Sequence, residues 1–107
     1  MPESQLDTVL QALRLELKKA LGDQLEAVIL FESQARGEAR IDSDIDVLIV
    51  VRDEFDYGDL IQRTSALVSA LSLEYDVVIS RAFTSRQRFD REHSPFFLNV
   101  RREGVTV

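Results

Sequence analysis

The sequence contains no cysteine, and only one of its 107 residues is a histidine. Without cysteine the chain forms neither disulfides nor thiolate metal sites, which suits a reducing compartment. The chain also has no apolar run near the roughly 20 residues that a membrane-spanning helix needs. Its first residues lack the basic and then apolar pattern of an export signal. We therefore expect a soluble, cytoplasmic protein that does not associate with membranes.

Basic residues are scarce over most of the chain. Residues 1–80 carry 7 basic and 16 acidic side chains, whereas residues 81–107 carry 6 arginines and 3 acidic residues. An acidic body argues against direct binding to nucleic acid, which relies on clustered lysine and arginine. The length and the 45% hydrophobic content fit one domain that spans residues 1–107.

The arginine-rich end of the chain, residues 83–107, also contains Phe89, Phe96, Phe97 and Leu98. We expect part of this segment to contact a partner protein or a second copy of the chain, with aromatic side chains inside and arginines at the rim. The alternative is that the phenylalanines only close the core. The single histidine, His93, lies in a polar stretch and fits a surface or capping role.

Hydrophobic periodicity predicts the helices and strands. Apolar residues recur at three- and four-residue spacing from Leu6 to Leu21, which predicts a helix that Gly22 ends. The further elements that we predict are strands at 24–31, 45–51 and 73–80, and helices at 57–73, 84–92 with Thr84 as N-cap, and 95–102 before Gly104. This order is typical of an α/β or α+β domain in which helices flank a small mixed sheet of three to four strands.

Acidic residues stand beside two of the predicted strands. Asp44 and Asp46 lie at the start of the strand 45–51, and alternation places them on one face while Ile45 and Val47 point to the other. Two close carboxylates repel each other, and a divalent cation such as Mg²⁺ removes this penalty. Asp76, in the strand 73–80, adds a third carboxylate. Three such groups could hold two metal ions about 3.5–4 Å apart, as in phosphoryl-type transfer.

The loop before these acids carries residues that suit phosphate binding. Ser33 directly follows a predicted buried strand and could open a helical turn whose free N–H groups bind an anion. Arg36 could stabilise phosphate charge, or it could pair with Glu38 on the surface. Gly37 suits a backbone bend, and Ser43 suits a turn before Asp44.

The pattern of Ser33, ten residues, and then Asp44-Ile45-Asp46 resembles the signature of the minimal nucleotidyltransferase (MNT) family, in the DNA polymerase β-like nucleotidyltransferase superfamily. Asp76 stands where this family has its third acid, and the likeness covers nearly the whole chain. The resemblance implies a nucleotidyltransferase fold and a Mg²⁺-dependent enzyme that uses ATP. It also implies that Asp44, Asp46 and Asp76 bind metal and act in catalysis, and that the loop with Ser33, Arg36, Gly37 and Ser43 binds the nucleotide.

Small MNT proteins typically act as antitoxins of a helical HEPN-domain ribonuclease, to which they transfer AMP at a tyrosine. The resemblance therefore implies a hetero-oligomer with a HEPN toxin as its partner. Two alternatives stay open at this point: a catalytically weak relative that neutralises the toxin by binding alone, and a free-standing enzyme that modifies a small molecule. Because 107 residues fit one domain, we expect no second domain of the kind with which larger relatives bind small substrates.

One residue departs from the family signature, because Glu32 stands where the signature has glycine. Glycine lets the backbone approach phosphates without a Cβ. Two like charges at 4 Å repel by about 4 kcal/mol in a surface-like dielectric, and a side chain that points to water feels far less. We expect Glu32 to point away from Asp44 and Asp46 and the enzyme to be active.

Overall fold

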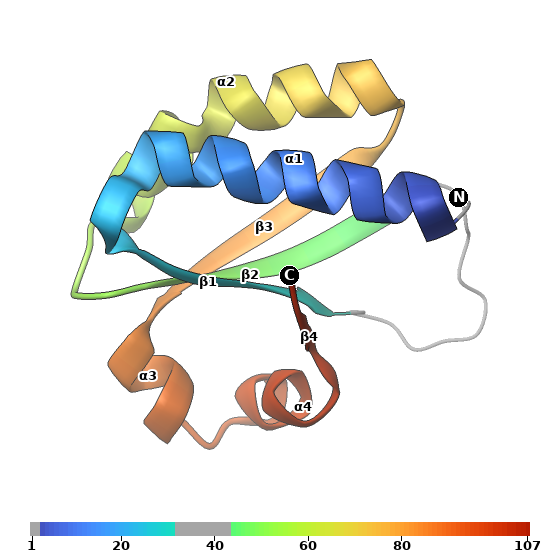
Figure 1. Cartoon of the computed structure of the whole chain (residues 1–107). Coiled ribbons are helices and arrows are strands. Elements are labelled where there is room, and N and C mark those ends of the chain that lie inside the picture. Colours follow the sequence, from blue (N-terminus) through green and yellow to red (C-terminus); the bar gives the residue numbers. More distant parts are fainter. Residues whose placement is uncertain (1–2, 32–43) are drawn as a thin grey trace.

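The computed structural model describes residues 3–31 and 44–107, without the side chains of Glu3, Ser4 and Asp44. The chain forms four α-helices, a short 3₁₀ turn and four strands over these residues (Figure 1). In chain order they are α1 (Glu3–Leu21), η1 (Gly22–Gln24), β1 (Leu25–Phe31), β2 (Asp44–Val51), α2 (Tyr57–Tyr75), β3 (Val78–Ser85), α3 (Arg86–Arg91), α4 (Pro95–Glu103) and β4 (Val105–Thr106).

The four strands form one mixed sheet in the order β3-β2-β1-β4. Strand β2 pairs with β1 in antiparallel orientation and with β3 in parallel orientation, and β4 adds a short antiparallel pairing to the outer edge of β1. The parallel pair needs a long crossover, and α2 supplies it. The predicted mixed sheet with flanking helices is therefore confirmed.

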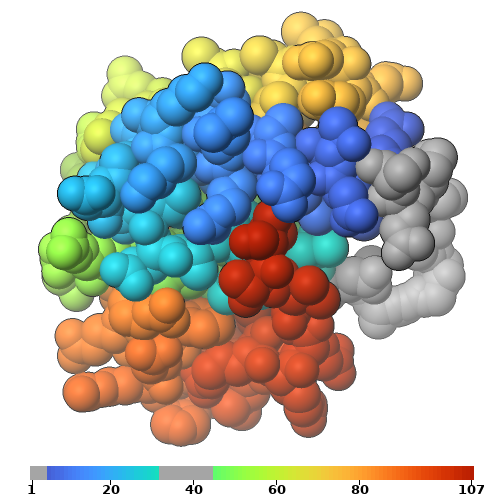
Figure 2. All heavy atoms as spheres, in the orientation of Figure 1, coloured from blue at the N-terminus to red at the C-terminus, as the bar shows by residue number. Residues whose placement is uncertain are grey.

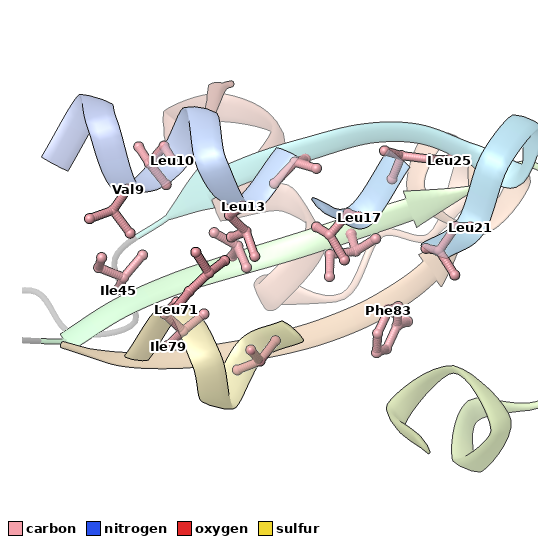
Figure 3. Close-up of a cluster of buried hydrophobic side chains, with 14 of the residues drawn as sticks. Val9, Leu10, Leu13, Leu17, Leu21, Leu25, Ile45, Leu71, Ile79 and Phe83 are labelled. Atoms are coloured by element: carbon pink, nitrogen blue, oxygen red, sulfur yellow. The ribbon is translucent and has the colours of Figure 1, made fainter. Parts of the chain in front are cut away.

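One face of the sheet is covered by the two long helices, α1 and α2 (Figure 1). The apolar stripe of α1 points into this layer, with Val9, Leu13 and Leu17 fully buried. Figure 3 shows these side chains directed toward those of the strands, including Ile45 and Ile79. Because this layer holds most of the buried side chains, it is the main hydrophobic core.

The opposite face is covered by the two short helices, α3 and α4, which lie below the sheet in Figures 1 and 2. Their buried side chains Phe89, Phe97 and Val100 pack against the inward-facing residues of β1 and β2, which are Ala27, Ile29, Leu48 and Val50. Both phenylalanines thus close a second, smaller core. Phe96 and Leu98 of α4, by contrast, are 42% and 43% exposed.

Two arginines join neighbouring elements through hydrogen bonds to the backbone and to side chains. The guanidinium of Arg101 donates hydrogen bonds to the backbone oxygens of Phe89 and, at 2.8 Å, of Glu92, so it joins α4 to the end of α3. Arg81 of β3 donates to Thr64 Oγ1 at 2.8 Å and to the Ile61 oxygen at 3.0 Å, both in α2. Partial burial lowers the pKa of Arg81, and nearby Tyr57 opposes this shift.

The structure confirms several predicted element boundaries. Helix α1 ends before Gly22, whose φ of 61° suits glycine, and α4 begins at Pro95 and is capped by Gly104. No helix in the described ranges is long and apolar enough to cross a membrane.

Other predicted boundaries are wrong. The segment 73–80 is not one strand, because α2 continues through Tyr75 and β3 begins only at Val78. The N-cap of α3 is Ser85 rather than Thr84, which belongs to β3, and the Ser85 hydroxyl accepts a hydrogen bond from the Arg88 N–H. Strand β4 was not among the predicted strands, since two residues carry no periodic pattern of their own.

Gly104 joins α4 to β4 where the backbone passes close to β1. A Cβ at this position would lie 2.5 Å from Ile29 Cγ2 and 2.6 Å from the Val100 oxygen. We expect Gly104→Ala to lower the free energy of unfolding by about 1–3 kcal/mol, because the added methyl group forces α4 or β4 to move. Urea denaturation measures this loss.

The matched control is Gly58→Ala, where the atom nearest to an added Cβ, Asp56 Oδ1, lies at 3.5 Å. This substitution should leave the protein equally stable or raise its stability by up to about 1 kcal/mol. Equal urea midpoints for Gly104→Ala and the natural protein would contradict the close packing.

Candidate active site

The lower face of the sheet, on which α3 and α4 pack, is only partly covered. Leu48 and Val50 in the second half of β2 are buried beneath the two helices. Asp46, which precedes them on the same face, is half-buried, and Val78 of β3 is 55% exposed. The polar start of β2 therefore lies where the lower layer ends.

The strand pairing gives Asp46 two direct neighbours. Phe31, the last residue of β1, is its partner on one side, and Ser80 of β3 is its partner on the other. Ile45 and Val47 are buried in the main core on the opposite face. The predicted alternation along this strand is confirmed for these three residues of β2.

Asp76 is not in a strand, contrary to the sequence-based prediction. It is the C-cap of α2, with φ 57° and ψ 51° in the left-handed region, and its side chain is exposed. The helix continues to Tyr75, whose half-buried ring packs against the main core. Aspartate tolerates the left-handed conformation better than most residues, so it ends the helix.

The strand register shows that Asp76 does not lie directly beside Asp44 or Asp46. Asp44 pairs with Val78, and Asp46 with Ser80, so Asp76 precedes the partner of Asp44 by two residues. Its role as a site residue stays a prediction. Ser80 is a polar neighbour of Asp46 that was not predicted, because only the parallel pairing of β2 with β3 brings the two residues together.

The remaining predicted site residues lie outside the described part of the chain. These are Ser33, Arg36, Gly37 and Ser43, together with Glu32 and the side chain of Asp44. Within residues 3–31 and 44–107 as described, no group of three or more His, Cys, Asp or Glu side chains is placed to hold a metal ion. The metal site therefore stays a prediction for Asp44, Asp46 and Asp76.

A mixed sheet whose central strand starts with Asp-x-Asp on a partly open face is the framework of a nucleotidyltransferase. The family model described as "Nucleotidyltransferase domain" matches residues 10–98, and the chain belongs to this family.

Two proteins of Methanocaldococcus jannaschii with the name "Putative protein adenylyltransferase" are similar in sequence. One is 37% identical over 89 residues, which cover 82% of this chain and 83% of the relative. The other is 36% identical over 72 residues, which cover 67% and 72% of the two chains.

The solved structures include one with the same fold. It is a chain from the crystal structure of a mutant of the toxin–antitoxin MntA–HpeT, at a TM-score of 0.55 and 21% identity. The match covers 88% of this chain and 68% of that chain.

The left-handed backbone conformation of Asp76 predicts how substitutions at this position change the stability of the protein. Glycine adopts this conformation without a Cβ penalty, and alanine pays about 1–2 kcal/mol. We expect the free energy of unfolding, measured by urea denaturation, to be highest for Asp76→Gly, intermediate for the natural protein and lowest for Asp76→Ala. An alanine variant as stable as the glycine variant would contradict the left-handed cap.

Proposed function

We propose that this protein transfers AMP from ATP to a tyrosine hydroxyl of a HEPN-domain toxin and thereby neutralises that toxin. Membership of the nucleotidyltransferase family supports the reaction class. The name of the two archaeal relatives supports a protein as the acceptor, and the structural neighbour from a toxin–antitoxin pair suggests the kind of partner. The observation that carries the proposal is the half-buried Asp46 at the open end of an otherwise apolar sheet face.

The donor set at this position fits Mg²⁺, which prefers hard oxygen ligands. Asp44 and Asp46 of β2 are the residues that would hold the ion, Asp76 is the third candidate, and the Ser80 hydroxyl lies at the level of Asp46. Bound Mg²⁺ supplies positive charge to the phosphate oxygens. A carboxylate next to Phe31 and before Leu48 has apolar neighbours, which strengthens its attraction for a cation.

The other residues take the roles that the family resemblance implies. Ser33, with Arg36, Gly37 and Ser43 in the same loop, binds the triphosphate. Asp76 helps to take the proton of the tyrosine hydroxyl. The oxygen of that hydroxyl forms a bond to the α-phosphorus while the bond from this phosphorus to the β-phosphate oxygen breaks, and pyrophosphate leaves.

Asp46→Asn should abolish AMP transfer, because it removes the charge that would hold the metal ion while it keeps the shape of the side chain. We expect at least a hundredfold loss, or about 2.7 kcal/mol in the barrier. The measurement is the transfer of labelled AMP from ATP to the HEPN protein in the presence of Mg²⁺. Asp44→Asn should behave alike.

The matched control is Asp53→Asn, an exposed acid just after the other end of β2, which should keep full activity. Full transfer by Asp46→Asn would overturn the assignment of the site. Neutralisation of the toxin without any label on it, by the natural protein and by Asp46→Asn alike, would favour a protein that acts by binding alone.

Glu32→Gly restores the residue of the family signature. We expect this change to alter the rate of AMP transfer by less than about tenfold, or 1.4 kcal/mol, because we expect the Glu32 side chain to point to water, where it would add little repulsion. Rates of label transfer with saturating ATP measure it. An inert natural protein beside an active glycine variant would show that Glu32 switches the enzyme off.

A further inference from the structure

Phe96 is an exposed aromatic residue in a fixed position. It lies in the first turn of α4, behind Pro95 and the N-cap Ser94, whose hydroxyl accepts a hydrogen bond from the Phe97 N–H. Its ring makes two edge-to-face contacts, with Phe31 at 5.4 Å between centroids and with Phe97 at 5.3 Å. The side chain is nevertheless 42% exposed. Two ring contacts hold this side chain while much of its surface stays open to a ligand.

The Phe96 ring lies beside the candidate active site. Phe31, which it contacts, is the direct strand partner of Asp46. Neighbouring strands are about 4.8 Å apart, so the three side chains Asp46, Phe31 and Phe96 follow one another over roughly 10 Å. This distance is comparable with the span from the α-phosphate of a nucleotide to its base.

We propose that Phe96, supported by Phe31, binds the base of the nucleotide by stacking. This inference rests on the proposed function and adds a base subsite to it. Stacking of a base on an aromatic side chain contributes on the order of 1–3 kcal/mol. A phenylalanine ring has no hydrogen-bonding group, so it does not read the edge of the base. ATP and GTP should therefore bind with affinities within about fivefold of each other.

The other side of Asp46 suits the acceptor better than the base. There β3 forms the edge of the sheet, where Val78 and Ser80 are exposed, and a protein acceptor needs such an open approach. The nucleotide base then occupies the side on which Phe31 and Phe96 lie.

The experiment compares the binding of ATP with that of inorganic tripolyphosphate, both with Mg²⁺, by calorimetry on the full chain. Phe96→Ala should raise the Kd for ATP by about 5- to 150-fold, the loss of one stacked base, and leave the Kd for tripolyphosphate unchanged. Phe96→Trp keeps an aromatic face, so its Kd for ATP should stay at least about fivefold below that of Phe96→Ala.

The control is Leu98→Ala, because Leu98 lies in the same helix and is 43% exposed, nearly the same as Phe96. It should bind ATP as the natural protein does. Urea denaturation of each variant separates a lost contact from a lost fold.

Two results would overturn the base subsite. The first is that Phe96→Ala binds ATP as tightly as the natural protein does. If this variant also has a raised KM for the HEPN protein, the ring contacts the acceptor instead of the base. The second is a natural protein that binds tripolyphosphate as tightly as ATP. A natural protein that binds neither ATP nor tripolyphosphate would overturn the proposed function itself, and the subsite with it.

Discussion

The burial of β2 on both faces is the constraint on which the rest of the structure depends. The residues from Val47 to Val51 are almost completely buried, so the strand needs a cover on each side. Helices α1 and α2 cover one face over its length, whereas α3 and α4 cover the other face only in part. The charged start of the strand lies where this second cover ends, because full burial of a carboxylate is costly. The position of the candidate site thus follows from the packing of the core.

The second cover, formed by α3 and α4, consists of two short helices that lack a long apolar stripe, so other contacts hold them together. Phe89, Phe96 and Phe97 pack edge to face, and Arg101 binds the last carbonyls of α3 while its guanidinium lies 6.0 Å from the centre of the Phe89 ring. Arg101 donates hydrogen bonds to carbonyls at the end of a short helix, where water would otherwise be the donor. The charged groups of this end of the chain are therefore partly structural.

The sequence predicts the parts of the fold that local patterns determine. The period of α1, the alternation around Asp46 and the signals of Pro95 and Gly104 are each read from a few neighbouring residues. The start of β3 is different, because Leu73 and Tyr75 fit both a helix and a strand. In the structure both belong to α2, where Tyr75 packs against the main core and Leu73 is exposed. Strand β4 exists only through its pairing with β1.

The same distinction applies to the candidate site, where some features follow from local sequence patterns and others depend on the fold. Alternation identifies the face of Asp46 from the sequence, and the family resemblance supplies the roles of Ser33 and Asp76. The neighbours of Asp46 could not be predicted, since Ser80 and Phe31 reach it through strand pairing and Phe96 reaches Phe31 through a helix that follows much later in the chain. Only the three-dimensional arrangement shows these contacts.

The order of the two covers along the chain has a consequence for synthesis on the ribosome. The buried residues of the main core all lie at or before Phe83, but the helices that cover Leu48 and Val50 follow later in the sequence. A nascent chain that has reached Ser85 therefore presents an apolar sheet face to its surroundings, the kind of surface that chaperones bind and that aggregates form from. The helix α4 that helps to close this face also brings Phe96 to Phe31, so the face is covered and the surroundings of the candidate site are completed by the same part of the chain.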